Sequence, residues 1–284
     1  MKISVLLSTY NAEKYIYDAI KSVLNQSFQD FELIIIDDAS TDRTVSIIER
    51  FNDKRIKLIK NTENRGLTVN LFNALYIAKG ELIARMDADD VCFIDRFKEQ
   101  VDFLDSNKKI DIVGSNVIII DENNNIIGAS NVFLKNRQIK SELLLINTLF
   151  HSSVMFRKSS LIDNNINYDI SYKTCQDFKL WSDCVGKLKF ANIKKPLLKY
   201  RVLSTGISRK EKKNKTIRIN SVLPIYKELY EKYNIKIEDK YFDVILNLFH
   251  DVAKKQDVTI LIKSLNIFLK YISKKNRTRS HVVL

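Results

Sequence analysis

The first hundred residues alternate between short apolar runs and amphipathic stretches. Ile3–Leu7 and Phe31–Ile36 have the pattern of buried strands, and apolar residues recur every three or four positions over Ile16–Leu24, as on one helix face. Strands that alternate with helices of this length predict a parallel sheet covered by helices on both faces. The alternation continues with a helix near 45–51, a strand at Ile56–Ile59, a helix near 67–78 and a strand at Leu82–Met86.

The pattern after residue 100 is more mixed. It predicts a hairpin that joins Ile112–Ile120 to Ile126–Ala129, and entirely helical structure beyond Ser208, in about three segments. We therefore expect an α/β domain with a mixed, mainly parallel sheet over residues 1–208 and a helical extension over residues 209–284. The other predicted elements are a helix at Gln138–Leu149, a strand at Val154–Arg157, a helix at Gln176–Val185 and short strands at Phe190–Ile193 and Leu197–Tyr200.

Polar clusters follow three of the predicted parallel strands. In open α/β sheets, ligands bind beyond the carboxyl ends of the strands. Because independent segments converge on that one edge, we expect a ligand site there. The clusters are Ser8-Thr9-Tyr10-Asn11, Asp37-Asp38-Ala39-Ser40 and Asp87-Ala88-Asp89-Asp90.

The composition is that of a globular protein, but its charge is uneven. Of the chain's residues, 45% are hydrophobic and 29% charged, and the net charge is +13. From Arg201 onward there are 19 Lys or Arg residues and only 8 Asp or Glu residues. Residues 1–200 contain the other 28 of the 47 basic residues and the other 26 of the 34 acidic residues, so they are nearly balanced. This asymmetry predicts two regions with different partners.

The sequence lacks the signals of secreted and membrane-spanning proteins. The apolar N-terminal stretch is too short for a signal peptide, and no run approaches the roughly 18 apolar residues of a spanning helix. Cys92, Cys175 and Cys184 fit no zinc or redox motif, and we expect buried free thiols. The sequence therefore predicts a cytoplasmic protein.

Asp87 and Asp89 are the first candidates for chemistry. Two carboxylates at i and i+2 after a strand can both reach a hard cation such as Mg²⁺ or Mn²⁺, which binds carboxylates and substrate phosphates. Such a cation would neutralise charge on a diphosphate leaving group. Alternatively, Asp89 or Asp90 caps the helix that contains Arg96. The motif alone leaves both interpretations open.

Asp37 and Asp38 present the same alternative. The following residues 40–42 make a good helix cap. However, adjacent acids at a strand end repel each other unless a donor meets them, and one of them could accept a base N–H. Residues 64–66 precede another helix start, where backbone N–H groups and Arg65 could receive phosphate. They could equally be a cap and a turn.

Taken together, these motifs resemble family 2 of the glycosyltransferases. STYN, DDASTDRT, NRGLTVNLFNAL and MDADD follow the order and spacing of that family. HSSVMFRKS (151–159), CQDFKLW (175–181) and YRVLSTGIS (200–208) resemble its later landmarks, so the resemblance covers about residues 1–208. It implies the GT-A (Rossmann-like) fold and an inverting transfer of sugar from a nucleotide diphosphate sugar, with Mn²⁺ or Mg²⁺ as cofactor.

The resemblance also implies roles for single residues. Asp177 falls on the catalytic base, which deprotonates the acceptor hydroxyl that attacks the anomeric carbon opposite the diphosphate. Without the resemblance, Asp177 could equally be an acid at a helix start. Asp89 and Asp87 fall on the metal side of the site. The positions that contact the nucleotide sugar are Thr9, Tyr10, Asp38, Arg65 and Asp87.

Some positions depart from the family pattern. Gln176 precedes Asp177 where Glu is usual, so this neighbour cannot raise the pKa of the base by repulsion. Leu203 stands where many members have a His that completes the metal site in some of them.

His151 is better explained as a polar residue at a strand entry near the acceptor pocket. Trp181, the only Trp, is not in the Gln-x-x-Arg-Trp motif of processive members, which favours single addition.

The resemblance and the basic tail together predict the partners. We expect a UDP-hexose or UDP-N-acetylhexosamine donor and a glycan or polyprenyl-diphosphate-linked acceptor in surface polysaccharide synthesis. An apolar helix face over Val258–Ile272 with basic flanks suits an anionic membrane surface, on the inner face of the cell membrane, or packing on its own domain. Aromatic residues are not interleaved with the basic clusters, so nucleic acid is not expected.

Two rival interpretations accompany this one. A nucleotidyltransferase would need a Gly-rich, basic phosphate loop near the N-terminus, and STYNAEKY is not one. A degenerate, non-catalytic nucleotide-sugar-binding module would explain Gln176 and Leu203 equally well.

Overall fold

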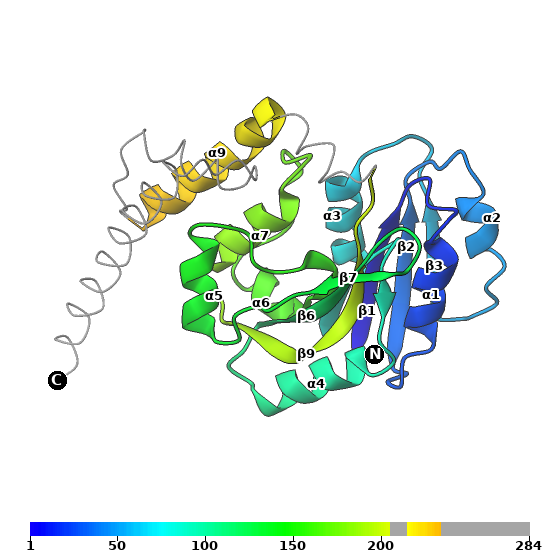
Figure 1. Ribbon diagram of the computed structural model, residues 1–284, viewed down its shortest axis with the longest axis horizontal. Helices are drawn as coiled ribbons and strands as arrows, with labels where there is room; N and C mark the ends of the chain where they lie inside the picture. Colours follow the sequence, from blue (N-terminus) through cyan, green and yellow to red (C-terminus); the bar gives the residue numbers. More distant parts are fainter. Residues whose placement is uncertain (205–214, 234–284) are drawn as a thin grey trace. The chain divides into compact units, whose positions relative to one another are not determined.

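A computed structural model describes residues 1–204 and 215–233 (Figure 1). The chain divides into two compact units, of which the first consists of Met1–Leu143 and Asn147–Gly206 and the second of Leu144–Ile146 and Ile207–Leu284. The domain boundary predicted after Ser208 falls outside the described residues, so it stays a prediction.

The strands are β1 (Ile3–Thr9), β2 (Phe31–Asp37), β3 (Ile56–Lys60), β4 (Leu82–Asp87), β5 (Val91–Cys92), β6 (Ile112–Ile120), β7 (Ile126–Ala129), β8 (Met155–Arg157) and β9 (Phe190–Arg201). The helices are α1 (Ile16–Leu24), α2 (Thr44–Ile48), α3 (Leu67–Ile77), α4 (Arg96–Ser106), α5 (Asn136–Leu143), the 3-10 turn η1 (His151–Ser153), α6 (Lys158–Ile162), α7 (Gln176–Cys184) and α9 (Lys215–Lys232).

One sheet of nine strands runs through the first unit. Its order is β3-β2-β1-β4-β8-β6-β9-β5, and β7 pairs with β6. The longest ladders, between β1 and its neighbours β2 and β4 and between β6 and β9, are parallel. The shorter strands β5, β7 and β8 are antiparallel to their partners. The predicted mixed, mainly parallel sheet is therefore confirmed.

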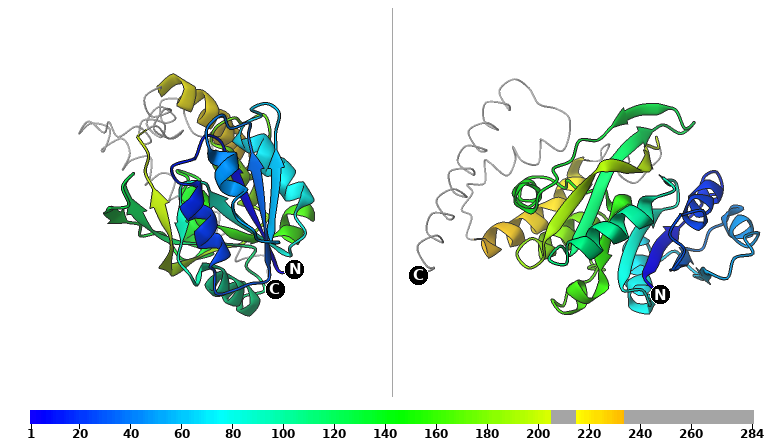
Figure 2. Two further views of the ribbon diagram at one scale, coloured as in Figure 1. Left: turned by 90° about the vertical axis from the view of Figure 1, so that its right-hand side faces the viewer. Right: turned by 90° about the horizontal axis from the view of Figure 1, so that it is seen from below.

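Successive residues of β1 face opposite sides of the sheet. Ile3, Val5 and Leu7 pack into the apolar core that also contains the buried face of α1. Ser8 faces the other side, where Asn70 of α3 donates to its hydroxyl at 3.0 Å. Figure 2 shows α1 and α3 on opposite sides of the sheet. The predicted helical cover on both faces is confirmed.

The end of one predicted helix and the division of one strand into two were wrong. The helix expected at Gln138–Leu149 is α5, which ends at Leu143. The two short strands expected at Phe190–Ile193 and Leu197–Tyr200 are the single strand β9. This strand continues through Pro196 because its register with β6 shifts on either side of Asn116, and an irregular pairing tolerates a proline. The two-residue strand β5 was not predicted.

The second unit contains α9. Tyr226 and Tyr230 of this helix donate from their hydroxyls to the carbonyl oxygens of Leu145 and Leu144, so that residues 144–146 belong to the same unit. The apolar face predicted over Val258–Ile272 lies outside the described residues, and the membrane contact expected of it stays a prediction. Within 1–204 and 215–233, no helix has the length and apolar character needed to cross a membrane.

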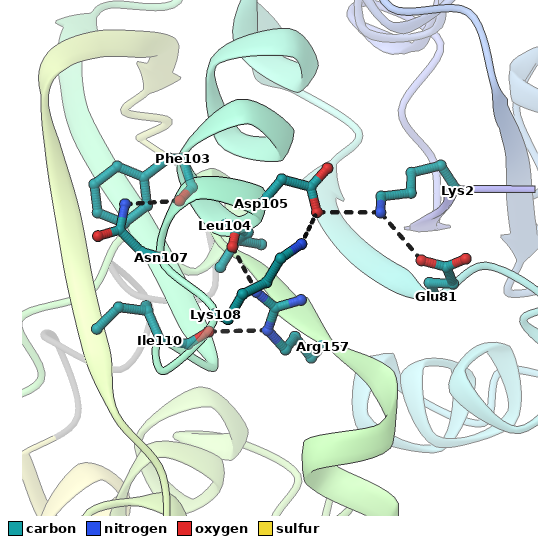
Figure 3. Close-up of polar contacts among 9 residues, drawn as sticks. All are labelled: Lys2, Glu81, Phe103, Leu104, Asp105, Asn107, Lys108, Ile110 and Arg157. Carbon is teal, nitrogen blue, oxygen red and sulfur yellow. Dashed lines mark hydrogen bonds and ion pairs between the residues drawn. The ribbon is translucent and has the colours of Figure 1, made fainter.

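A polar network ties α4 to the amino ends of β1 and β4 (Figure 3). Arg157 donates from Nη2 to the carbonyl of Leu104 at 2.6 Å and from Nε to that of Ile110 at 3.0 Å. Lys2 bridges Glu81 and Asp105 at 3.1 and 3.3 Å. The guanidinium of Arg157 thus adds a second donor to the carbonyl of Leu104, which also accepts the N–H of Asn107 at 3.2 Å, and binds the carbonyl of Ile110 beyond the end of α4.

Arg157→Ala is expected to lower the free energy of unfolding by about 1–3 kcal/mol, because two part-buried hydrogen bonds from the charged guanidinium, to the carbonyls of Leu104 and Ile110, are lost. Urea denaturation measures the change. Lys108→Ala is the matched control, since Lys108 is exposed and makes only a surface pair with Asp105, and we expect little change from it. An equal loss from both variants would contradict this role of Arg157.

Candidate active site

The register of the sheet brings the predicted polar clusters to one edge. Thr9 at the end of β1 is paired with Asp37 at the end of β2. On the other side of β1, Ser8 is paired with Asp87, which ends β4. The convergence of these three strand ends is therefore confirmed, and we call this edge the rim.

The loops after β1 and β2 hold each other by reciprocal hydrogen bonds. The backbone N–H of Asn11 donates to the Ser40 hydroxyl at 2.9 Å, and the N–H of Thr41 donates to the Asn11 side chain at 2.8 Å. Asn11 and Ala39 both have positive φ, at 48° and 62°, so both chains turn sharply where the strands end. The fixed turns leave Tyr10 51% exposed at the rim.

Two buried polar atoms at the rim lack hydrogen-bond partners within the described part of the chain. They are the hydroxyl of Thr9 and the Oδ1 oxygen of Asp37. The other oxygen of Asp37 accepts the N–H of Ser40 at 3.0 Å. Buried polar atoms are normally satisfied, so these two positions favour a ligand that brings a donor and an acceptor.

Asp38 anchors the start of α3. Its two oxygens accept the backbone N–H groups of Arg65 and Gly66, each at 2.9 Å. Burial would raise the pKa of Asp38, but these bonds and those from Asn61 and Asn70 outweigh it and lower the pKa. Asp38 therefore shapes the loop that carries Arg65. Of residues 40–42, which were expected to cap the following helix, Asp42 accepts the N–H of Thr44 at 2.9 Å, although the N-cap residue of α2 is Arg43.

Gly66 has a φ of 87°, which a glycine adopts without strain, and it directly precedes α3. The guanidinium of Arg65 is 48% exposed, and its Nε lies 3.8 Å from the exposed carboxylate of Glu63. Such a surface pair is weak, so Arg65 can turn toward an anion at the rim.

The acidic turn after β4 is not a helix cap. The next helix, α4, has Asp95 as its N-cap residue. The alternative that Asp89 or Asp90 caps this helix is therefore wrong. Asp87 and Asp89 are both half-buried at the rim, whereas Asp90 is 1% exposed.

Two arginines that the sequence analysis missed hold this turn. Arg85 is fully buried and donates from Nη2 to Asp87 and from Nη1 to the carbonyl of Leu6. Arg201 donates from Nε to the carbonyl of Asp89 at 2.7 Å, and its own N–H donates to Asp90 at 2.7 Å. The only signal for Arg85 was a charge inside an apolar strand, two residues before an acid.

Asp90 is a structural acid. One oxygen accepts the Arg201 N–H and the other accepts the hydroxyl of Ser152, so it joins β4 to β9 and η1. Burial first, and then repulsion from Asp89 and Asp87, raises the pKa of Asp90 well above its ordinary value. Asp90 is thus buried, and both of its oxygens accept hydrogen bonds from the protein, whereas Asp87 and Asp89 lie at the rim.

The pair of Asp87 and Asp89 fits a hard divalent cation. Burial, with added repulsion from Asp87, raises the pKa of Asp89 to about 7, and a dication would offset that repulsion. In the described residues no group of three or more His, Cys, Asp or Glu side chains is arranged to hold a metal. The pair therefore fits a cation whose other ligands are phosphates or water.

Asp177 lies in the first turn of α7, as the helix-start interpretation expected. Its Oδ1 accepts the N–H of Phe178 at 2.8 Å, and its Oδ2 accepts the side-chain amide of Asn147 at 2.6 Å. Burial raises the pKa of Asp177; these two bonds oppose the rise, and repulsion from Asp87 adds to it. The helix of Asp177 is linked to the acidic turn, because its Trp181 packs against His151 and the next residue, Ser152, donates to Asp90.

His151 belongs to a buried layer below the rim. Its Nε2 is 2.8 Å from the hydroxyl of Tyr168, and its ring packs edge-on against Trp181 with centroids 5.9 Å apart. Burial, with the charge of Arg85, lowers the pKa of His151 well below its ordinary value, so the ring is neutral. It precedes β8, as expected of a strand-entry residue, but it is only 8% exposed.

None of the three cysteines is in a disulfide, and the predicted burial holds for two of them. Cys92 and Cys184 are buried, and Cys175, directly before α7, is half-buried with a positive φ of 57°.

The chain is similar to known glycosyltransferases in sequence. The model of the family described as glycosyl transferase family 2 matches residues 4–164. An uncharacterized glycosyltransferase of Haemophilus influenzae is 33% identical over 211 residues, which cover 70% of this chain and 65% of that protein. The chain thus spans less than two thirds of the length of that relative.

A second relative has a specific name. The UDP-Glc:alpha-D-GlcNAc-diphosphoundecaprenol beta-1,3-glucosyltransferase WfgD of Escherichia coli is 29% identical over 211 residues, which cover 68% of this chain and 83% of WfgD.

Two solved structures are similar in fold. S. aureus TarS 1-349 in complex with UDP-GlcNAc has a TM-score of 0.60 at 24% identity, over 88% of this chain and 71% of that chain. The mannosyltransferase PcManGT of Pyrobaculum calidifontis, in complex with GDP-Man and Mn²⁺, has a TM-score of 0.60 at 16% identity, over 94% and 80% of the two chains. At these identities the likeness shows the fold, and it confirms the predicted GT-A class.

Proposed function

The chain belongs to glycosyl transferase family 2, and on that premise we propose that it transfers a single sugar, with inversion, from a nucleotide diphosphate sugar. The proposed donor is a UDP-hexose or UDP-N-acetylhexosamine, since WfgD is named for UDP-Glc and TarS was solved with UDP-GlcNAc. The proposed acceptor is a glycan or a polyprenyl-diphosphate-linked sugar in surface polysaccharide assembly, the class that the name of WfgD indicates.

One arrangement carries the proposal. The ends of β1, β2 and β4 form one rim with a nucleotide side at Thr9 and Asp38 and an acidic side at Asp87. Asp177, from a distant segment, lies on α7, which reaches the acidic turn through the packing of Trp181 on His151 and the hydrogen bond from Ser152 to Asp90. A donor diphosphate beside the acidic turn and an acceptor beside Asp177 would therefore meet at one place.

The nucleotide side binds and orients the donor. The exposed ring of Tyr10 offers a stacking surface for the base. The Thr9 hydroxyl and Asp37 Oδ1, which lack partners within the described chain, are suited to polar atoms of the base or ribose. Arg65, placed by the bonds from its loop to Asp38, can bind the diphosphate in a bidentate way.

Asp87 and Asp89 would hold the Mn²⁺ or Mg²⁺ ion together with the donor's phosphates. When bound, the ion supplies Lewis-acid neutralisation of the diphosphate leaving group. The protein fixes both acids beforehand, because Arg85 bonds the carboxylate of Asp87 and Arg201 bonds the backbone of Asp89. A prearranged pair of this kind needs little reorganisation when donor and ion arrive.

Asp177 accepts the proton of the acceptor hydroxyl. The hydroxyl oxygen forms a bond to the anomeric carbon while the bond from that carbon to the diphosphate oxygen breaks, and the electron pair leaves with the diphosphate. One displacement from the opposite face inverts the configuration. A raised pKa makes Asp177 a stronger base than an ordinary aspartate.

The direct test is incubation with Mn²⁺ and a panel of nucleotide sugars, in which slow donor hydrolysis or transfer is measured. We expect turnover of a UDP-sugar that stops when EDTA removes the metal. UDP binding without turnover of any donor, with or without acceptor, would refute the proposal and favour the non-catalytic module.

Tyr10→Ala is expected to weaken UDP binding about 5- to 150-fold, since base–aromatic stacking contributes about 1–3 kcal/mol per base. Titration calorimetry with UDP measures the affinity. Tyr76→Ala is the matched control, because Tyr76 is 80% exposed on α3 and is not at the rim. Unchanged UDP affinity in the Tyr10 variant would remove Tyr10 from the site.

A further inference from the structure

Asn147 was not singled out by the sequence, and it contacts the proposed base directly. We propose that Asn147 is the positioning residue that aims the carboxylate of Asp177 at the acceptor hydroxyl, an inference that rests on the proposed function. The amide nitrogen of Asn147 donates to Oδ2 of Asp177 at 2.6 Å, across thirty residues of sequence.

Two donors from different segments fix the plane of the carboxylate. The N–H of Phe178, on the helix of Asp177 itself, reaches Oδ1 at 2.8 Å, and Asn147 reaches Oδ2. Each oxygen of an ionised carboxylate has about two acceptor positions. One position on each oxygen is thus engaged, and rotation of the group would break at least one bond. The acceptor hydroxyl would donate to one of the remaining positions.

The direction of the Asn147 amide is defined on both sides. Its nitrogen faces Asp177, while its oxygen faces the N–H of Leu149 at 3.4 Å. The residue lies between the end of α5 and the turn η1, where residues 144–146 belong to the second unit and Asn147 to the first. The helix predicted through Leu149 ends at Leu143, and this ending gives Asn147 its non-helical position.

A neutral donor suits the charges around Asp177. Asp87 on β4, Tyr168 before α7 and Tyr200 on β9 are among the titratable groups that interact with Asp177. Repulsion from Asp87 disfavours the ionised form of Asp177, and the Asn147 amide stabilises that form without adding a charge. Because Gln176 is also neutral, no carboxylate precedes the base in the sequence to oppose its ionisation. Asn147 itself neither gains nor loses a proton in the reaction.

Asn147→Leu keeps the approximate volume and removes the donor. We expect kcat to fall about 10- to 100-fold, as when a reacting group is misplaced, with the donor KM and the UDP affinity within about twofold of wild type. The acid limb of the kcat profile should move to higher pH, because the ionised base loses a stabilising bond. Asn147→Gln, which restores an amide donor, should recover part of kcat.

Asn164→Leu is the control for the loss of an asparagine donor, since the amide of Asn164 donates to the backbone carbonyl of Ser160 at 2.9 Å and does not contact Asp177. It should leave kcat and the pH profile unchanged. If the leucine variant at 147 does not fold, Asn147→Asp keeps the shape and should shift the acid limb further upward by repulsion. An unmoved pH profile, or a loss of kcat matched by equal losses of UDP affinity and melting temperature, would overturn the inference.

A double variant separates this inference from the proposed function. If Asn147 acts through Asp177, Asp177→Asn with Asn147→Leu should lose no more activity than Asp177→Asn alone. If Asp177→Asn alone keeps full activity, the base assignment itself is wrong. If Asp177→Asn is inactive but Asn147→Leu has wild-type kcat and pH dependence, only the role of Asn147 fails.

Discussion

Asp177→Asn is expected to lower kcat by about 10³-fold or more while UDP affinity stays within about twofold, because general-base assistance contributes about 10²–10⁴ in rate. The substitution keeps the shape of the side chain and removes its ability to take a proton. The nucleotide side of the rim, at Thr9 and Tyr10, comes from other segments and is not disturbed. Initial rates at saturating donor, with UDP titrations beside them, separate the two effects.

The pH dependence of the wild-type enzyme is a second readout of the same prediction. Burial raises the pKa of Asp177, and repulsion from Asp87 adds to the rise. Since the base must be ionised, kcat should fall as the pH drops through a value above the ordinary range of aspartate. The asparagine variant has no group to titrate there, so its residual rate should lack this limb.

Asp183→Asn provides the control, since Asp183 lies on the same helix and forms an ion pair with Lys179 at 2.8 Å. We expect it to retain kcat, which would exclude a general effect of charge removal on α7. Substantial transfer by Asp177→Asn, with the acid limb in place, would show that another group takes the proton.

The rim could be predicted from the sequence because parallel strands leave little freedom. A buried strand that alternates with helices has a recognisable pattern, and the polar residues that follow it lie at its carboxyl end. Thr9, Asp38 and Asp87 were therefore expected at one edge, and the registers of β1, β2 and β4 place them there. The prediction needed only local patterns and one topological rule.

The contacts that organise the site could not be predicted in this way. Ser152 reaches Asp90 across 62 residues and Arg201 reaches Asp90 across 111, and no local pattern relates such positions. Arg85 was hidden for a different reason. The pattern of buried strands predicts apolar side chains, so it gives no reason to expect a buried guanidinium inside β4. Its partner Asp87 was expected to contact the metal or the nucleotide sugar and was not considered as the partner of an arginine.

Errors in the elements had physical causes too. Leu143 and the apolar residues after it continue the spacing of a helix face. Such a spacing does not distinguish apolar residues buried in a helix from apolar residues buried in a turn after it. For β9, two exposed lysines and Pro196 suggested an interruption, but the shifted pairing with β6 carries the strand through. Asn147 was missed as a consequence of the first error, because it was assigned to the interior of a helix.

Asp89→Ala is expected to lower kcat by about 10³-fold and to abolish the effect of metal on UDP binding, because Lewis-acid stabilisation of a leaving group contributes several kcal/mol. Asp89 and Asp87 are the half-buried acids of the turn, and the described residues contain no third His, Cys, Asp or Glu arranged with them. Loss of one ligand should therefore not be compensated. Titration calorimetry of UDP with and without Mn²⁺ gives a readout that does not depend on turnover.

Asp102→Ala is the control, since Asp102 is an exposed acid on α4 in a surface pair with Lys98. In wild type and in this control, Mn²⁺ should strengthen UDP binding to the same extent. If Asp89→Ala also binds UDP more tightly with Mn²⁺, the ion is held without Asp89. Leu203 offers no ligand atom to replace it, and Asp90 is engaged by Ser152 and Arg201. Asp87 alone would then have to hold the ion with the donor phosphates, and Asp87→Ala would be the variant that abolishes the metal effect.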